Sequence, residues 1–305
     1  MDPVSAMLQA LDLTDTGART NEDIFTGPSQ WMPHGRVFGG QVLAQSIIAA
    51  SRTLPDERII HSLHGYFLRP GDVKLGVTLG VDRIHDGRSF STRRVQTYQG
   101  GVPIMSLIAS FQVDQGGVEH QLDMPAGLPE PESLPTVTAL LAGSQHPAAQ
   151  FWTEARPFDI RYVDTPVYLP IDGAGERVAH QAVWLRAKAT LPDDPVLHRA
   201  AMAYASDYTI LEPVLRRHGA AWATPGLKMA SLDHAMWWHR PARADEWLLY
   251  VEDAPSAQGG RGLAHARIYR RDGVLAATVA QEGMIRIPDE GTARGDAPAD
   301  GTAGA

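Results

Sequence analysis

The sequence contains no cysteine, no run of 18 apolar residues and no basic start followed by an apolar core. The absence of cysteine excludes disulfides, thiolate metal sites and a cysteine nucleophile. The absence of a long apolar run excludes a transmembrane helix, and the acidic beginning of the chain is unlike a secretory signal. We therefore expect a cytoplasmic protein with no stable insertion into a membrane.

Several catalytic motifs are absent as well. The chain has no Gly-x-Ser-x-Gly sequence, which argues against a serine hydrolase of that type. The glycines at 173–175 lack the third glycine of a dinucleotide-binding loop. His234 and His239 lie close together in an aromatic segment, but no third ligand accompanies them. Hydrogen-bonded strand histidines are therefore a better interpretation of this pair than a metal site.

The net charge of −8 is concentrated in two stretches. Residues 114–135 hold five acids and no lysine or arginine, and residues 289–305 hold four acids and one arginine. The remainder of the chain is neutral, which argues against nucleic acid as a partner because such a partner requires a basic face. A small anionic ligand held by a local arginine cluster stays possible.

The periodicity of apolar residues divides the chain into two similar halves. We expect a short helix within residues 1–20, a strand at 23–26, a helix from Gly39-Gly40 that ends before Pro55, and four antiparallel strands between 59 and 113. A surface linker rich in proline, glycine and acid follows, with a short helix near 136–142. Further strands surround a second helical segment in the second half.

An internal repeat supports this division. Ser62-Leu63-His64 and Ser231-Leu232-Asp233 lie 169 residues apart, and each is followed by an aromatic residue and Arg-Pro. Two copies of one helix-plus-sheet unit are therefore expected, with their sheets merged side by side so that fewer edges stay open. This predicts an α+β protein with units at 1–115 and 156–288, a linker at 116–155, and a disordered acidic tail at 289–305.

Residues 198–219 form the central segment of the second half. Apolar residues recur there at three- and four-residue steps, which predicts one long helix that Pro213 ends or kinks near Glu212. Asp207 lies on or beside the apolar face. Taken alone, an acid at this position is more readily explained as a helix cap or a solvated residue than as a catalytic group.

Eight motifs between about residue 10 and residue 286 resemble the acyl-CoA thioesterase II family. In chain order they are RVFGGQVLAQ, HSLHGYFLRPGD, DGRSFSTRRV, ASFQ, ASDYTIL, PGLKMASLDHAMWWHRP, EWLLY and GVLAATVAQEGMIR. The resemblance implies a tandem double hot-dog fold, in which each long helix is wrapped by an antiparallel sheet. It implies hydrolysis of acyl-CoA to free fatty acid and CoA without metal, cofactor or acyl-enzyme. It also implies assembly into a homodimer or homotetramer.

The resemblance also implies the site residues. The family's acid, hydroxyl and amide, which activate a water, fall on Asp207, Ser231 and Gln281, and a weaker candidate falls on His61. Bacterial members carry threonine where this chain has Ser231, a change that keeps the hydroxyl.

Two further expectations follow from the chemistry and from the repeat. A backbone N–H of Gly39 or Gly40 is expected to polarise the substrate carbonyl. The repeat offsets map Asp207 to Phe38 and Gln281 to Ala109, so one site per chain is expected, in the second half.

Two alternatives to hydrolysis stay open. A hot-dog acyl-CoA hydratase would need an Asp–His pair facing the acyl chain, and Asp233-His234 are adjacent strand residues that face opposite sides. A non-catalytic acyl-CoA-binding protein would keep a tunnel for the acyl chain and lose the acid at position 207. Arg93-Arg94 and Arg270-Arg271 are candidates for contact with the CoA phosphates, although solvated sheet faces explain both pairs better.

Overall fold

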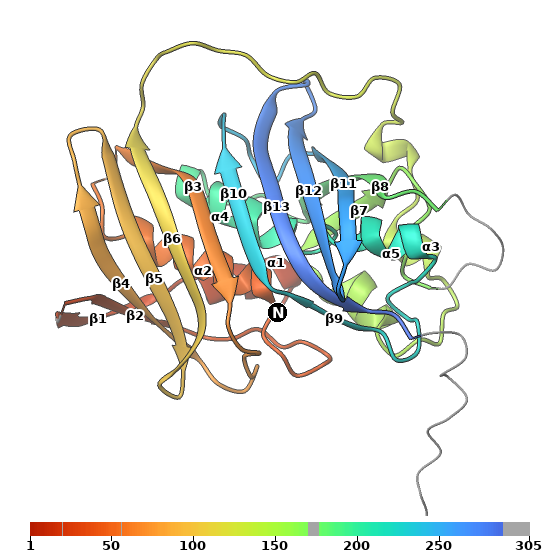
Figure 1. Cartoon of the computed structure of the whole chain (residues 1–305), viewed down its shortest axis with the longest axis horizontal. Helices are drawn as coiled ribbons and strands as arrows, with labels where there is room; N and C mark the ends of the chain where they lie inside the picture. Colours follow the sequence, from red (N-terminus) through yellow and green to blue (C-terminus); the bar gives the residue numbers. More distant parts are fainter. Residues whose placement is uncertain (20, 56, 170–176, 289–305) are drawn as a thin grey trace, which may run out of the picture.

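We analysed a computed structural model of the chain, which describes residues 1–19, 21–55, 57–169 and 177–288. The acidic tail predicted at 289–305 lies outside the described residues. Among the described residues, no helix is both long enough and apolar enough to cross a membrane. Figure 1 shows one broad sheet with helices packed behind it.

The first half forms a helix-plus-sheet unit, as the sequence predicts. Its elements are α1 (Pro3–Leu11), β1 (Thr14–Arg19), β2 (Asp23–Gly27), α2 (Gly39–Ser51), β3 (Arg58–Phe67), β4 (Val77–Asp86), β5 (Phe90–Gln99) and β6 (Val102–Val113). The N-terminal helix is shorter than the predicted region of 1–20. The chain leaves it at Leu11, and β1 then pairs with β2 at the edge of the sheet.

The second half repeats this arrangement after a connecting segment. The connection contains η1 (Pro131–Ser133), α3 (Val137–Leu140), which lies within the predicted short helix, and η2 (Phe151–Ala155). The second unit contains β7 (Phe158–Tyr162), β8 (His180–Ala187), α4 (Pro195–Ser206), α5 (Glu212–His218), β9 (Lys228–Ser231), β10 (Asp233–Trp238), β11 (Leu248–Gln258), β12 (Arg261–Arg270) and β13 (Leu275–Arg286).

The two sheets merge into one, which confirms the predicted double hot-dog architecture. The described strands run in the order β1-β2-β4-β5-β6-β3-β10-β13-β12-β11-β8-β7, and β9 pairs with β13. The seam is the antiparallel pair β3–β10, in which Leu63 lies opposite Met236 and His64 opposite Ala235. Each unit thereby covers an edge strand of the other, and an open edge would otherwise favour aggregation.

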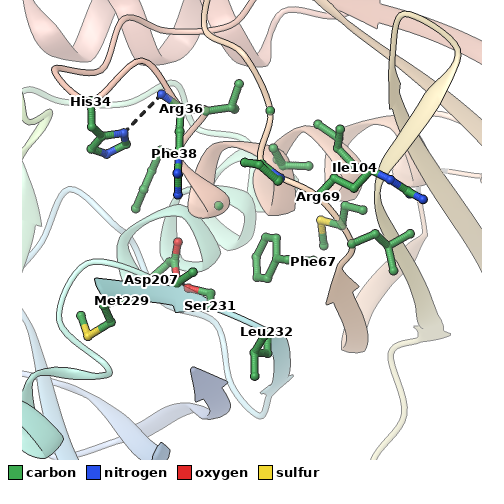
Figure 2. A pocket seen from close by; sticks show the side chains of 18 of the residues that line it. His34, Arg36, Phe38, Phe67, Arg69, Ile104, Asp207, Met229, Ser231 and Leu232 are labelled. Atoms are coloured by element: carbon green, nitrogen blue, oxygen red, sulfur yellow. Dashed lines mark hydrogen bonds between the residues drawn. The ribbon is translucent and has the colours of Figure 1, made fainter. Parts of the chain in front are cut away.

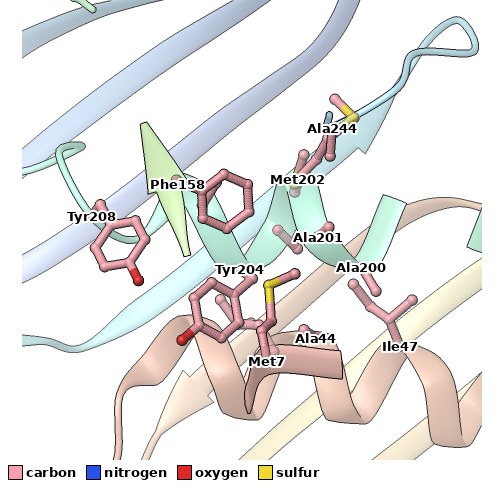
Figure 3. Close-up of a cluster of buried hydrophobic side chains, with 14 of the residues drawn as sticks. Met7, Ala44, Ile47, Phe158, Ala200, Ala201, Met202, Tyr204, Tyr208 and Ala244 are labelled. Atoms are coloured by element: carbon pink, nitrogen blue, oxygen red, sulfur yellow. The ribbon is translucent and has the colours of Figure 1, made fainter. Parts of the chain in front are cut away.

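The helices α2 and α4 pack against each other within the main core. Their contact is built from small residues such as Ala44, Ala200 and Ala201, with Ile47 among them (Figure 3). Ile47 is completely buried, and burial of such a side chain contributes about 1.5–3 kcal/mol. The small side chains let the two backbones approach closely, which brings the start of α2 to the end of α4.

One prediction about the second half is wrong. The segment 198–219 is not a single helix, because α4 ends at Ser206 and α5 begins at Glu212. Pro213 lies in the first turn of α5 instead of ending the first helix. The N–H groups in the first turn of a helix have no partner within the helix. Proline, which lacks a backbone N–H, therefore costs no hydrogen bond at this position. The break therefore falls at Asp207, five residues earlier than Glu212.

Candidate active site

Asp207 is the first residue beyond α4, at the point where the chain turns towards α5. Its Oδ1 atom accepts hydrogen bonds from Ser231 Oγ at 3.0 Å and Gln281 Nε2 at 2.9 Å. Its Oδ2 atom accepts the backbone N–H of Gly40 at 2.9 Å. Residues from α2, β9 and β13 therefore converge on one carboxylate, and Gly40 belongs to the other unit.

The electrostatic setting of Asp207 favours a basic carboxylate. Burial raises the pKa of Asp207 above its usual range, whereas the hydrogen bonds from Gln281, Ser231 and Gly40 lower it. Burial is the largest of these effects, so the pKa of Asp207 is raised overall. A carboxylate with a raised pKa binds a proton more readily, which is the property required of a general base.

Ser231 and Gln281 come from neighbouring strands. Ser231 ends β9 and lies opposite Gly283 of β13, two residues from Gln281. The Gln281 amide donates to Ser231 Oγ at 2.8 Å as well as to Asp207. The serine hydroxyl can therefore donate to Asp207 while it accepts from Gln281.

The N–H group that the first unit contributes belongs to Gly40, the second of two glycines at the start of α2. A Cβ atom on Gly39 would lie 2.6 Å from Asp207 Oδ2, and one on Gly40 would lie 2.3 Å from the backbone oxygen of Tyr204. A side chain at either position would therefore prevent the hydrogen bond between the N–H of Gly40 and Asp207. The expected role of Gly40 changes, because its N–H bonds to Asp207 and is not free for a substrate carbonyl. Gly39 lines the cleft described next.

A cleft of about 390 Å³ opens beside this cluster (Figure 2). Asp207 and Ser231 lie in its wall among mostly apolar residues. The apolar lining includes Phe38, Val42, Phe67, Ile104, Met105, Tyr208, Leu211, Trp222 and Met229. Three basic side chains also line it, and Figure 2 shows His34 and Arg36 on one side and Arg69 on the other. The cleft therefore combines an apolar interior, a carboxylate and a basic rim.

The structure does not bring every predicted residue to the cleft. Gln281 is 1% exposed and is not among the lining residues, so it lies behind Asp207 and Ser231. His61 is also absent from the lining, and its Nε2 atom lies 2.9 Å from Ser110 Oγ on the adjacent strand. Burial lowers the pKa of this histidine. His61 is thus a half-buried residue of the sheet that does not contact the other candidates.

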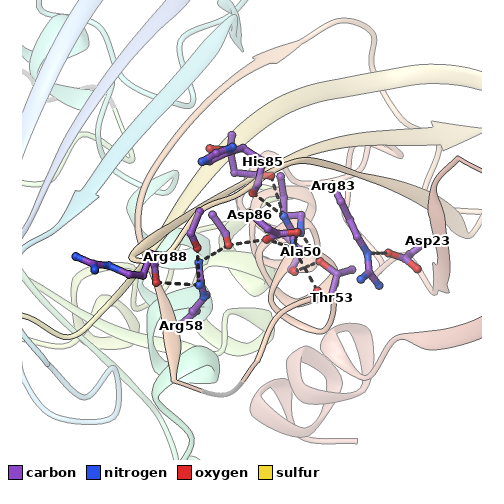
Figure 4. A network of polar contacts seen from close by, with 12 residues as sticks. Asp23, Ala50, Thr53, Arg58, Arg83, His85, Asp86 and Arg88 are labelled. Atoms are coloured by element: carbon purple, nitrogen blue, oxygen red, sulfur yellow. Dashed lines mark hydrogen bonds and ion pairs between the residues drawn. The ribbon is translucent and has the colours of Figure 1, made fainter.

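Both arginine pairs that were considered for phosphate contact have partners within this chain instead. Arg93 is 1% exposed and pairs with Asp86 within a buried polar network that also includes Thr53 and Arg58 (Figure 4), so the expected solvated face is wrong for this residue. Arg94 pairs with Asp82. In the second pair, Arg270 binds Asp272, and Arg271 binds Glu130 and Glu132 of the connecting segment. All four arginines are therefore already paired with acids of this chain.

The sequence did not identify His234 as part of this cluster. Its Nδ1 atom contacts Gln281 Oε1, and its Nε2 atom lies 3.1 Å from Ser206 Oγ. The prediction of a hydrogen-bonded strand histidine is confirmed, and no group of three potential metal ligands occurs within the described ranges. Strand alternation could have indicated this contact from the sequence, because the register that sets Ala235 opposite Ala280 also brings His234 beside Gln281.

Comparison with known proteins matches both units of the chain. A family model described as acyl-CoA thioesterase matches residues 154–284, and one described as acyl-CoA thioesterase N-terminal domain matches residues 27–112. The chain is 39% identical to the human acyl-coenzyme A thioesterase 8 over 88% of this chain and 86% of that protein. It is 36% identical to acyl-CoA thioesterase 2 of Haemophilus influenzae, over 87% of this chain and 93% of that protein.

Solved structures agree with these matches. The structure of acyl-CoA thioesterase II TesB2 from Mycobacterium marinum superposes with a TM-score of 0.73 at 41% identity, covering 93% of this chain and 98% of that one. A protein of Alicyclobacillus acidocaldarius described as having a hot dog fold superposes with a TM-score of 0.74 at 19% identity, covering 93% of this chain and 99% of that one. The second likeness concerns the fold alone.

Proposed function

Because this chain belongs to the acyl-CoA thioesterase II family and is an acyl-CoA thioester hydrolase, we propose that Asp207 and Ser231 activate the water that attacks the thioester carbonyl. Gln281 holds these two residues in place. The observation that supports this proposal is the position of Asp207. It is a hydrogen-bonded carboxylate with a raised pKa in the wall of an apolar cleft.

The reaction requires a base, a directed water and a leaving group. One proton of the water passes to Asp207 while the water oxygen bonds to the carbonyl carbon. The tetrahedral intermediate then breaks its carbon–sulfur bond, and the departing thiolate takes the proton back from Asp207. Atoms and charge balance, and no covalent bond to the enzyme is formed.

Ser231 directs the water. Its hydroxyl donates to Asp207 Oδ1 and accepts from Gln281, which leaves one lone pair on Oγ. That lone pair accepts the second hydrogen of the water. With both hydrogens fixed, the water's own lone pair points towards the carbonyl carbon, and such orientation supplies much of the catalytic advantage in reactions of this kind.

The basic rim fits the charged end of the CoA substrate. Arg36 and Arg69 are exposed and line the cleft, and no ion pair among the described residues involves either of them. Arg69 Nη1 donates to the backbone oxygen of Pro103 at 2.9 Å. The chain as a whole carries a net charge of −8, so an anionic substrate needs a local source of positive charge. We assign the nucleotide phosphates of CoA to this rim and the acyl thioester to the apolar interior.

The two alternatives have less support. In the hydratase alternative, Asp233 would act with His234, but Asp233 Oδ1 accepts the N–H of Glu282 at 2.7 Å, and neither residue lines the cleft. A non-catalytic binder would not require a hydrogen-bonded carboxylate at this place. Assembly as a homodimer or homotetramer stays a prediction, which light scattering tests.

The decisive variant for this function is Asp207→Asn, which removes the base and keeps the shape of the side chain. We expect its kcat to fall at least about a hundredfold, because general base catalysis contributes about that much or more. Thiol release from a panel of acyl-CoA substrates of different chain length measures the rate, and circular dichroism checks the fold. A folded Asp207→Asn protein with wild-type turnover would show that Asp207 is not the base.

A further inference from the structure

We infer that His234 is a positioning residue for thioester hydrolysis, holding the Gln281 amide in the one orientation that serves Asp207 and Ser231. The inference rests on the proposed function, because it concerns the same site. It assigns His234 the neutral form that carries its proton on Nδ1. His234 itself does not line the cleft, so its effect on the reaction passes through Gln281.

The orientation of the Gln281 amide follows from its neighbours. An ionised carboxylate can only accept hydrogen bonds, so the side of the amide that faces Asp207 must be the NH₂ group. The same group lies 2.8 Å from Ser231 Oγ. The amide oxygen must then face the opposite way, where it contacts Nδ1 of His234.

The tautomer of His234 follows in turn. An amide oxygen only accepts hydrogen bonds, so Nδ1 must carry the proton. Burial lowers the pKa of His234, although Asp207 and Gln281 oppose this effect, so the ring is neutral at physiological pH. The neutral ring leaves a lone pair on Nε2. Ser206 Oγ lies 3.1 Å from Nε2 and 2.9 Å from the backbone oxygen of Ala203, and its single proton can be donated to only one of them at a time.

The result is a directed chain of hydrogen bonds from His234 through Gln281 to Asp207, and Ser206 lies beside Nε2 of the histidine ring. These residues are shielded from solvent, because His234 is 0% exposed and Ser206 and Gln281 are each 1% exposed. Water cannot replace a lost donor cheaply in such a place. Without the His234 proton, the buried amide oxygen loses its partner, and a rotated amide would present oxygen to the Asp207 carboxylate.

The consequence for the reaction is specific. A rotated amide weakens the hold on Asp207 and Ser231, which act on the water, and leaves the apolar walls of the cleft unchanged. The loss should therefore be in kcat, with little change in KM. This separates a positioning role from a general packing role, which would affect stability and substrate binding together.

The mutational test compares three variants of the full-length enzyme. We expect His234→Ala to lower kcat by about ten- to a hundredfold with KM changed less than about twofold. His234→Asn, whose amide NH₂ can replace the Nδ1 proton, should recover most of that loss. His239→Ala is the matched control, since His239 follows the same strand and bonds to Thr278 outside the site. Equal losses in His234→Ala and His234→Asn, or a change in KM alone, would overturn the inference.

A measurement on the unmodified enzyme keeps the inference testable if these variants fail to fold. Nitrogen-15 NMR of the histidine side chains should show His234 neutral, with the proton on Nδ1 and none on Nε2. A proton on Nε2 in the neutral ring would overturn it. This result is independent of the Asp207→Asn rate, so failure of the orienting role and failure of the proposed base can be distinguished.

Discussion

The two ends of the α2–α4 pair are built alike but carry different residues. At one end, α4 stops at Asp207 against the start of α2, where Gly40 donates its N–H to the carboxylate. At the other end, α2 stops at Arg52, and a separate hollow is lined by Arg52 together with Asp194 and other residues at the start of α4. There Pro195 follows the helix cap, and a proline has no N–H to donate.

The comparison shows which end serves stability. A cation is favoured at the C-terminus of a helix, so Arg52 suits its place, and its guanidinium binds the backbone oxygen of Leu13 and the carboxylate of Asp12. An acid is disfavoured at the end of its own helix, so the Asp207 carboxylate depends on the N–H of Gly40 at the start of α2 and on the hydrogen bonds from Ser231 and Gln281. A local choice that opposes stability is expected at functional sites. Under the proposed mechanism, one end of the pair serves folding and the other serves the chemistry.

The comparison also corrects the mapping between the halves. A constant offset of 169 residues pairs Asp207 with Phe38. The structural counterpart of Asp207, which ends α4, is Arg52, which ends α2. The offset changes because the second half has α5 between its helix and its next strand. The expectation of one site per chain is unchanged, since neither Phe38 nor Arg52 supplies a carboxylate.

The strongest test of this asymmetry removes the same hydroxyl from both units. Ser231→Ala should lower kcat by about ten- to a hundredfold, because it removes a hydrogen-bonding group that orients the attacking water. Ser62→Ala, the counterpart by sequence in β3, should leave kcat unchanged. Steady-state kinetics of both proteins provides the comparison. Similar losses in the two variants would mean that the serines act through the seam of the sheet and not through the water.

A second test concerns a buried acid beneath the turn that follows Asp207. Glu252 is fully buried, and burial raises its pKa to about 8, while Thr209 in the turn after Asp207 donates to it at 2.6 Å. The folded protein therefore holds a proton on Glu252 that the unfolded chain releases near pH 4.5. Stability should fall as the pH rises from about 4.5 to about 8 and then level off.

Glu252→Gln should remove this dependence. We expect the variant to gain about 4 kcal/mol of stability relative to the wild type between pH 5 and pH 9, because the wild-type acid is opposed by about 1.4 kcal/mol per pH unit over about three units and the neutral amide is not. Urea denaturation at several pH values measures the difference. If the two proteins show the same dependence on pH, Glu252 does not hold a proton in the folded state.

The smallest expected effect lies in the first unit. Arg36→Ala should raise KM for acyl-CoA by about tenfold, since loss of a contact between charged groups costs about 1–2 kcal/mol. Its kcat should be unchanged, and so should its KM for acyl-pantetheine, which lacks the nucleotide phosphates. Arg94→Ala, already paired with Asp82 in the fold, is the control. An equal change with both substrates would place Arg36 in contact with the acyl arm.

Periodicity and turn residues were enough to predict most of the fold. The four strands β3 to β6 match the four antiparallel strands predicted between 59 and 113. The break at Asp207 was missed because Pro213 can end one helix or begin another, and only tertiary packing decides between these roles. The partnership between Gly40 and Asp207 joins residues 167 positions apart, and no local pattern reports such a contact.

The central claim is that Asp207 removes a proton from water and forms no bond to the substrate. The direct measurement is a single turnover with excess enzyme in oxygen-18 water, followed by mass spectrometry of the acid and of the Asp207 peptide. A general base predicts label in the acid after that first turnover and none in the peptide. An unlabelled acid followed by label in the Asp207 peptide would instead establish a covalent acyl-enzyme and contradict the mechanism.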